Sequence, residues 1–416
     1  MSELFNEQVF ENALVSLCET ELGYKHVYGY DVDRDYKDCL YEDELNLSIR
    51  RINPSIPDDA ISSALFTIKN RLEGTLLQRN EQFHNYLQNS VEVSCQNNGK
   101  TEYHRVKLID FDNVENNSFV VANQWTITGS ENKRPDVILF INGIPLVLME
   151  LKSCSREQTD VSDAYLQIRN YMQIIPQVFS YNAFCIISDM LTTRAGTITA
   201  DETRFMAWKT IDGSEYLDNP DFSILVKGML EKNRLLDIIR NFIVFQKEEK
   251  GDIKILAAYH QYFAVHKALD STLGALGTTR KGGVFWHTQG SGKSLSMLFL
   301  THLLRERLTN PTIVVLTDRN DLDNQLYSQF AKCQGFLRTE PQNAGSCEEL
   351  TTLLSNTEYG GIYFSTMQKF EETSEPFSLR DNIIILADEA HRSQYGLDEK
   401  FDVKNQKMKK GYRSSW

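Results

Sequence analysis

Residues 134–152 read RPDVILFINGIPLVLMELK, and this stretch decides the fold. Two apolar runs, 137–141 and 146–149, flank the dipeptide Asn142-Gly143. Asn-Gly between two apolar runs is a strong signal for a β-hairpin, because both residues tolerate a positive φ. The sequence therefore predicts a buried hairpin here.

Charged residues stand at the outer ends of this hairpin. Glu150 and Lys152 are two apart on one strand and share a face, and Asp136 precedes the other strand. Two carboxylates and a backbone carbonyl, here that of Leu151, hold hard cations such as Mg²⁺, and a lysine orients the attacking water. The pattern is typical of a metal-dependent phosphodiesterase. The alternative is a buried hairpin whose charged ends are merely solvated.

The pairing of the two strands decides whether the carboxylates meet. An ideal two-residue hairpin pairs Asp136 with Met149, which places Asp136 on the face opposite Glu150. Convergence requires a bulge or a bend. We expect it near Pro145, because proline inside a strand marks an edge or a bulge.

The flanking segments predict the rest of an α/β core with catalytic groups at the edge of its sheet. The predicted helices are residues 4–20, 57–72, 76–87, 161–174 and 235–245. The predicted strands are residues 91–94, 103–109, 119–124 and 184–188, the last of these extending the hairpin sheet.

Two of these helices carry further candidate residues. Gln167 and Tyr171 are four apart, hence on one helix face, and an exposed glutamine beside a half-buried tyrosine is the alternative. Glu11 lies in the first helix. We favour a packing helix with solvated acids there, and contact between Glu11 and the metal site is the alternative.

The composition limits the class of protein. The net charge is −13, so nucleic-acid contacts are expected only in local clefts or through partner subunits. The seven cysteines form no CxxC pair, which argues against zinc and fits a reducing cytoplasm. No apolar run reaches the roughly 20 residues of a membrane span, and the acidic N-terminus is unlike a secretory signal.

A second motif, GGVFWHTQGSGKS, occupies residues 282–294. A buried strand over 284–286, a glycine-rich loop and a helix from Leu295 form the context of a phosphate-binding loop. Its backbone amides would cradle phosphates, Lys293 would reach the β and γ phosphates, and Ser294 would bind Mg²⁺. His287 stands where the full pattern has glycine. The candidate nucleotide-binding residues are Thr288, Gly290, Ser291, Gly292, Lys293 and Ser294.

Further downstream, the buried-strand pattern of residues 382–387 ends in Asp388-Glu389-Ala390-His391. Asp388 would hold Mg²⁺, and Glu389 would activate the attacking water. Together with strands expected at 312–316 and 361–364, this spacing predicts a parallel sheet.

Upstream of the loop, Tyr259 and Gln261 are candidates for recognising adenine, and ordinary helix surface is the alternative. The charged segment KEEKG at residues 247–251 marks the domain boundary. We therefore expect a nuclease domain over 1–245 and an ATP-binding motor domain over 246–416.

These motifs resemble two known families. GSGKS and DEAH are similar to the first, RecA-like motor domain of superfamily 2 helicases, and Asp136…Glu150-Leu151-Lys152 resembles the PD-(D/E)xK nucleases. Their order, with Gln167 and Tyr171 as a QxxxY motif, resembles the restriction (R) subunit of type I restriction-modification enzymes. Similar phrases run along nearly the whole chain: RPDVILFINGIPLVLMELK, AAYHQYFAV, HTQGSGKS, VVLTDRNDLDNQL and DEAHRSQYG.

The resemblance implies a nuclease domain with a mixed sheet, a parallel-sheet motor, and Mg²⁺- and ATP-dependent cleavage of double-stranded DNA coupled to translocation. It also implies partners, the methyltransferase and specificity subunits. The chain ends at Trp416, without the second motor domain and the helical region that the family carries, so we expect weak ATP binding and no translocation from the chain alone. A repair-type helicase-nuclease and a non-catalytic fragment that binds DNA or a partner are the alternatives.

Overall fold

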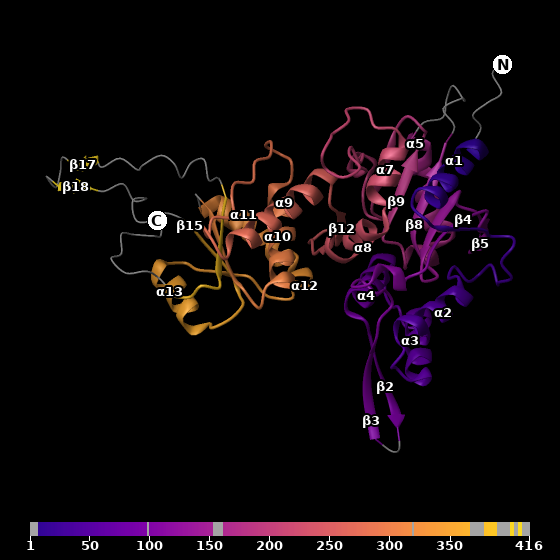
Figure 1. Cartoon of the computed structure of the whole chain (residues 1–416), viewed down its shortest axis with the longest axis horizontal. Coiled ribbons are helices and arrows are strands. Elements are labelled where there is room, and N and C mark those ends of the chain that lie inside the picture. The colour runs from indigo at the N-terminus through magenta and orange to yellow at the C-terminus, as the bar shows by residue number, and fades with distance from the viewer. Residues whose placement is uncertain are drawn as a thin grey trace. The chain divides into compact units, whose positions relative to one another are not determined.

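The computed structural model describes residues 7–97, 100–152, 161–317, 320–366, 378–388, 400–402 and 407–409 (Figure 1). The chain divides into two compact units. The first comprises Met1–Phe245 and Lys250–Phe263, and the second comprises Gln246–Glu249 and Ala264–Trp416. The assignment of a nuclease to residues 1–245 and a motor to 246–416 stays a prediction.

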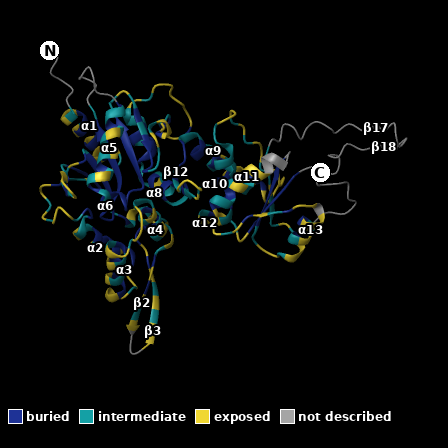
Figure 2. Ribbon diagram, turned by 180° about the vertical axis from the view of Figure 1, so that it is seen from behind, coloured by how far each residue is buried: buried dark blue, intermediate teal, exposed yellow. Residues whose placement is uncertain are grey.

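A mixed six-stranded sheet forms the centre of the first unit, in the order β1-β4-β7-β8-β9-β10. Its strands are β1 (Lys25–Tyr28), β4 (Phe119–Asn123), β7 (Val137–Ile141), β8 (Ile144–Leu151), β9 (Phe184–Ser188) and β10 (Thr193–Gly196). β1 pairs with β4 and β8 with β9 in parallel, and the other pairs are antiparallel. Every residue from β4, β7, β8 and β9 is buried (Figure 2). The predicted mixed sheet is confirmed.

Helices pack on this sheet through apolar stripes. In α5, the residues Val161, Ala164, Ile168 and Tyr171 are buried, a helical spacing that faces β8 and β9. α4 begins with a capping box in which Thr75 and Gln78 satisfy each other's backbone amides. The helices of this unit are α1 (Glu7–Thr20), α2 (Glu42–Ile52), α3 (Asp58–Asn70), α4 (Leu76–Asn89), α5 (Val161–Ile174), α6 (Pro176–Phe179), α7 (Phe222–Met229) and α8 (Lys232–Asn241).

Shorter strands lie outside this sheet: β2 (Val91–Asn97), β3 (Lys100–Val106), β5 (Ile127–Thr128), β6 (Asn132–Lys133), β11 (Ile243–Gln246) and β12 (Ile253–Leu256). The strands predicted at 91–94 and 103–109 form a ribbon of their own, which projects beside α3 (Figure 1). The predicted helix over 235–245 is wrong at its end. α8 stops at Asn241 because the β-branched pair Ile243-Val244 enters strand β11.

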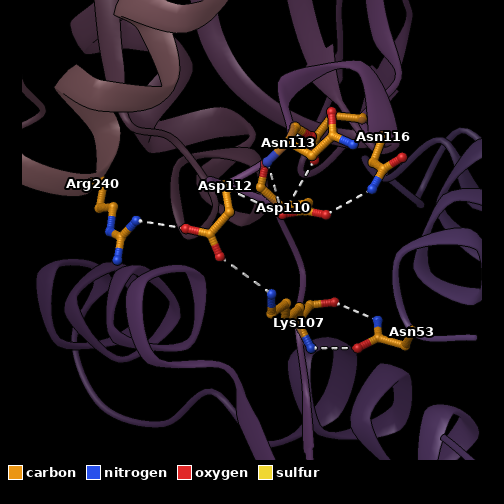
Figure 3. Close-up of polar contacts among 8 residues, drawn as sticks. Asn53, Lys107, Asp110, Asp112, Asn113, Asn116 and Arg240 are labelled. Carbon is orange, nitrogen blue, oxygen red and sulfur yellow. Dashed lines mark hydrogen bonds and ion pairs between the residues drawn. The ribbon is translucent and has the colours of Figure 1, made fainter. Parts of the chain in front are cut away.

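A polar loop lies at the turn end of the hairpin. The carboxylate of Asp110 accepts hydrogen bonds from the backbone amides of Asp112 and Asn113 (both 3.2 Å) and from the side-chain amide of Asn116 (2.9 Å) (Figure 3). Asp112 forms ion pairs of 3.6 Å with Lys107 and Arg240 (Figure 3). This loop is therefore closed on itself by Asp110 and tied to α8.

The loop also fixes the turn itself. The buried Asn142 side chain donates to the carbonyl of Leu108 (2.9 Å) and to Asn117 Oδ1 (2.8 Å), and it accepts from the amide of Ser118 (2.8 Å). Asn142 and Gly143 have φ values of 52° and 78°, as a tight hairpin turn requires. The asparagine thus serves both the turn conformation and a buried hydrogen-bond network.

The second unit contains a four-stranded parallel sheet in the order β14-β15-β13-β16. Its strands are β13 (Thr312–Thr317), β14 (Gln342–Asn343), β15 (Ile362–Thr366) and β16 (Ile383–Ala387). The helices are α10 (Lys293–Arg307), α11 (Asn320–Lys332), α12 (Gln334–Leu337) and α13 (Cys347–Asn356), and α9 (Tyr259–Ala275) begins in the first unit. Two short strands, β17 (Lys400–Asp402) and β18 (Lys407–Lys409), pair with each other in a separate two-stranded sheet. The predicted parallel sheet is confirmed.

Two predictions for this unit were wrong. Residues 284–286 form no strand, and Val284 and Trp286 are 81% and 82% exposed. Positive φ values at Arg280 and Gly283 turn the backbone just before this segment, and no described strand pairs with it. β16 is a strand as expected, but it is only partly buried instead of buried. It is an edge strand of the described sheet, so one of its sides has no neighbouring strand there.

Candidate active site

A β-bulge sets the geometry at the open end of the hairpin. Ile141 pairs with Ile144 and Phe140 with Pro145, but Leu139 pairs with Val147, so Leu146 is an extra residue. The bulge thus follows Pro145 directly, where the sequence predicted it.

The bulge shifts every later pair by one residue. The last paired row is Val137 with Met149, so the next row brings Asp136 opposite Glu150. Opposite residues of an antiparallel pair lie on one face. The two carboxylates therefore converge, which the unbulged register would prevent.

Hydrogen bonds lock these groups in place. Asp136 Oδ2 accepts from the backbone amide of Leu151 (2.7 Å), across the hairpin. Glu150 Oε1 pairs with Lys152 Nζ (2.7 Å), and the same ammonium lies 3.3 Å from the carbonyl oxygen of Leu151. The structure brings Asp136, Glu150, Leu151 and Lys152 together, as the sequence predicted.

The electrostatics of this cluster are unusual. Burial raises the pKa of Asp136 to about 6, opposed by the amide of Leu151 and the charge of Lys152. Burial, reinforced by the charge of Asp136, raises the pKa of Glu150 to about 8. Burial lowers the pKa of Lys152, but Glu150 outweighs it and the net pKa is raised. Burial thus favours the protonated forms of both carboxyl groups, beside a lysine whose charged form Glu150 stabilises.

The donor atoms fit a hard divalent cation. Glu150 Oε2 is buried and has no hydrogen-bond partner among the described residues. Asp136 and the carbonyl of Leu151 add oxygen donors beside it. The described residues contain no cluster of three or more His, Cys, Asp or Glu that would complete a cage. Mg²⁺ is usually held by one or two carboxylates together with waters and substrate phosphates, so this donor set suits it.

Helix α5 brings Gln167 and Tyr171 to the same cluster. Tyr171 is 4% exposed, and its hydroxyl donates to the carbonyl of Arg134 (3.4 Å), two residues before Asp136. Burial and the charge of Glu150 raise the pKa of Tyr171, while Gln167 acts in the opposite direction. The half-buried Gln167 therefore lies beside the hydroxyl, and the two side chains lie near the carboxylates.

Glu11 of α1 is buried rather than solvated, contrary to the favoured expectation. Its Oε1 accepts from Asn123 Nδ2 (2.7 Å), Gln124 Nε2 (3.1 Å) and Gln8 Nε2 (3.2 Å), and the Glu11 charge contributes to the raised pKa of Asp136. Sequence analysis missed the two amides at the end of β4. No local pattern reports this contact, because Glu11 and Asn123 are 112 residues apart along the chain.

In the second unit, the phosphate-loop motif runs into the start of α10. The helix begins at Lys293, and Gly292 is its N-cap with φ 78°. Gly290 also has a positive φ of 81°, and the amide of Ser291 donates to the carbonyl of Thr288 (3.3 Å). Ser294 is the second residue of the helix, so its amide and that of Lys293 lie among the unpaired donors at a helix N-terminus.

The acidic motif follows β16. The amide of Asp388 donates to the carbonyl of Leu316 (2.8 Å), at the carboxyl edge of the parallel sheet where Thr317 and Thr366 also lie. Glu389 and His391 lie outside the described residues. Asp388 therefore occupies the predicted edge, and its role toward a metal stays a prediction.

Tyr259 and Gln261 lie at the start of α9, in the part of the chain that belongs to the first compact unit. Gln261 is 4% exposed, and its Oε1 accepts from the amide of Ala258 (2.9 Å), which caps the helix. The Tyr259 ring contacts those of Trp208 and Tyr216. Their part in adenine recognition stays a prediction.

Comparisons with known proteins match both units. The family model described as type I restriction enzyme R protein N terminus matches residues 4–204, which include the hairpin and α5. The model described as SWI2/SNF2 ATPase matches residues 260–413, which include the phosphate-loop motif and the parallel sheet. The chain belongs to the R-subunit family of type I restriction enzymes.

Relatives of this R-subunit chain are spread over bacteria and archaea. The HindI endonuclease subunit of Haemophilus influenzae is 38% identical over 98% of this chain and 41% of the relative. The putative MjaIXP endonuclease subunit of Methanocaldococcus jannaschii is 34% identical over 95% of this chain and 41% of the relative. The chain thus spans about two fifths of the length of these relatives. Within its described part, no helix is long and apolar enough to cross a membrane.

Proposed function

We propose that this R-subunit chain hydrolyses phosphodiester bonds of double-stranded DNA with Mg²⁺ and is coupled to ATP-driven translocation. It would act in the cytoplasm, beside methyltransferase and specificity subunits. The observation that carries the proposal is the bulge-dependent meeting of Asp136 and Glu150 next to Lys152. These three side chains on one buried hairpin are the groups that a metal-dependent nuclease uses.

Each residue has a role in this proposal. Asp136, Glu150 and the Leu151 carbonyl would hold Mg²⁺, which when bound activates water and offsets charge on the phosphate. Lys152 would orient the attacking water, since its ammonium is already held by Glu150. Tyr171, aided by Gln167, would keep Arg134 and the following Asp136 in register through its bond to the Arg134 carbonyl.

The second unit would supply the nucleotide site. Amides of the loop from Thr288 to Ser294 would cradle the phosphates of ATP, with Gly290, Ser291 and Gly292 forming its bend. Lys293 would reach the β and γ phosphates. Ser294 and Asp388 would hold Mg²⁺, Glu389 would activate water, and Tyr259 with Gln261 would recognise adenine.

Metal binding and plasmid cleavage test the nuclease. Mn²⁺ serves as a probe for the divalent-cation site. It should bind the wild-type chain, and this binding should be lost in Asp136→Asn and Glu150→Gln. Supercoiled plasmid with Mg²⁺ should be nicked by the chain, alone or supplied with the partner subunits, and Lys152→Ala should lower the rate at least about 100-fold. Lys25→Ala, which changes an exposed lysine, is the matched control. Metal binding or cleavage that survives these site variants would contradict the proposal.

A fluorescent ATP analogue tests the second site. Lys293→Ala should weaken its binding by at least about tenfold, because one charge-assisted contact to phosphate is lost. Lys281→Ala removes an exposed lysine shortly before the loop and should leave the affinity unchanged. Equal affinities for the chain and for Lys293→Ala would exclude this loop as the ATP site.

A further inference from the structure

A cavity of about 290 Å³ lies in the first unit, away from the hairpin site. Its walls come from the loop before α2, the end of α3, the first turn of α4, and α6 with the residues after it. No residue of β7, β8 or α5 lines it. The volume is near the lower limit of small-molecule pockets, which suits a ligand larger than a single water or metal ion.

Most of the charged residues in the lining are cationic. Lys37, Lys69 and Arg79 line the cavity against one carboxylate, that of Asp38. Lys69 is already paired with Glu42. Asp38 interacts with Lys69 and Glu42, and its burial raises its pKa to about 6. The cavity therefore carries positive charge in excess.

Arg79 is the unusual member. It is half-buried, and its Nε is shielded from solvent and donates to no acceptor in the described part of the chain. An N–H that loses water without gaining an acceptor is unfavourable. Ser180, also in the cavity wall and 4% exposed, has an Oγ without a partner among the described residues. Both residues line the cavity, and each carries a polar atom without a partner among the described residues.

We propose that this cavity binds a phosphate group, with Arg79 as its main ligand and Lys37 and Ser180 as further donors. Arginine binds phosphate through parallel N–H···O bonds, and Arg79 lines the cavity. The cationic side chains come from three separate segments, which suits a tetrahedral oxyanion better than a flat carboxylate. The phosphate belongs either to a free small molecule or to the DNA backbone. The site is independent of the proposed nuclease function.

Thermal unfolding of the full chain tests the site, with inorganic phosphate as the probe and sodium chloride at matched ionic strength as the reference. Phosphate should raise the Tm of the wild-type chain. Arg79→Gln should weaken phosphate binding about tenfold or more, without lowering the Tm in chloride, because it removes an uncompensated charge. Lys37→Gln, at an exposed position that does not affect folding, should weaken binding about two- to fivefold.

Arg71→Gln is the matched control, since Arg71 is an exposed arginine at the end of α3 that does not line the cavity. A deoxynucleoside monophosphate and a short duplex, compared with phosphate, identify the source. Stabilisation by either that is lost in Arg79→Gln supports the site and assigns it to a free or a polymeric phosphate. A phosphate effect equal to that of chloride, or one retained in both Arg79→Gln and Lys37→Gln, would overturn the proposal.

Discussion

The carboxylate of Asp136 accepts a 2.7 Å hydrogen bond from the backbone amide of Leu151, on the opposite strand of the hairpin. This bond exists because the bulge at Leu146 moves Asp136 one residue along β8. It ties the Asp136 carboxylate to the backbone beside Glu150, so the two carboxyl groups are held close together. The candidate active site thus holds both carboxyl groups in place, and burial raises the pKa of each.

The first prediction follows from the burial of Glu150, reinforced by the charge of Asp136. The folded-state pKa of Glu150, about 8, lies above its ordinary value of 4.5, so the folded chain binds the extra proton between these two pH values. Stability falls as pH rises through this window. In EDTA, Glu150→Gln should be more stable than the wild type at pH 8, by on the order of 2 kcal/mol, and the difference should shrink toward pH 5.

Urea unfolding at several pH values, with and without Mg²⁺, measures this effect. At free Mg²⁺ ten times its Kd, the wild type should gain about 1.4 kcal/mol that Glu150→Gln does not gain. Glu92→Gln is the control, because Glu92 lies exposed on the β2–β3 ribbon. A wild-type chain more stable than Glu150→Gln at pH 8 in EDTA would show that Lys152 fully compensates the buried acid.

A second prediction distinguishes the role of the Tyr171 hydroxyl in cleavage from the role of its ring in the packing of α5. Tyr171→Phe keeps the ring and removes the 3.4 Å bond to the Arg134 carbonyl together with the contacts of the hydroxyl with Gln167 and Glu150, so unfolding should change by about 1 kcal/mol. Metal-dependent cleavage should fall about tenfold, because the chain before Asp136 is less firmly placed. Tyr165→Phe is a close control. Tyr165 lies on the same helix and donates a 3.4 Å bond to the carbonyl of Ala200. Equal loss of activity in both variants would assign the effect to the helix as a whole.

The third prediction concerns the turn. Asn142→Ala removes the three side-chain hydrogen bonds and leaves alanine, which tolerates φ 52° less well than asparagine, so it should cost about 4 kcal/mol of unfolding free energy. Asn142→Gly removes the same bonds without the strain and should cost about 3 kcal/mol. Asn310→Ala isolates the strain, because Asn310 is exposed with φ 46°, and should cost about 1 kcal/mol. A small effect of Asn142→Ala in urea unfolding would mean that the polar loop is not needed for the hairpin.

The sequence correctly predicted those parts of this site that depend on residues close together in the chain. Asn142-Gly143, the apolar runs and Pro145 lie within a few residues, and their turn and bulge follow from backbone sterics. The amides that hold Glu11 were missed because Asn123 is 112 residues away along the chain, and no local pattern reports such a contact. The strand predicted at residues 284–286 was wrong because a local pattern was trusted without its long-range partner. An apolar run predicts a strand only if a neighbouring strand is there to pair with it.

A fourth prediction concerns Lys254, a buried residue that sequence analysis did not single out. Its ammonium donates to Asn80 Oδ1 (2.8 Å) and to the carbonyl of Asn182 (2.7 Å), which joins β12 to α4 and to the segment before β9. Burial lowers the pKa of Lys254 to about 7 from 10.5. Between these values the unfolded chain binds more protons than the folded chain, so stability should rise with pH, by up to about 1.4 kcal/mol per unit.

Comparison with Lys254→Met isolates this contribution from all other titrations. The stability of the wild type relative to the variant should be flat below pH 7 and should increase from pH 7 to pH 10 in urea unfolding. Lys25→Met, at an exposed position of β1, should show no such rise. A difference between wild type and Lys254→Met that does not vary with pH would mean that Lys254 keeps its charge when buried. The two hydrogen bonds to Asn80 and Asn182 would then be charge-assisted, and loss of the lysine should be costly at every pH.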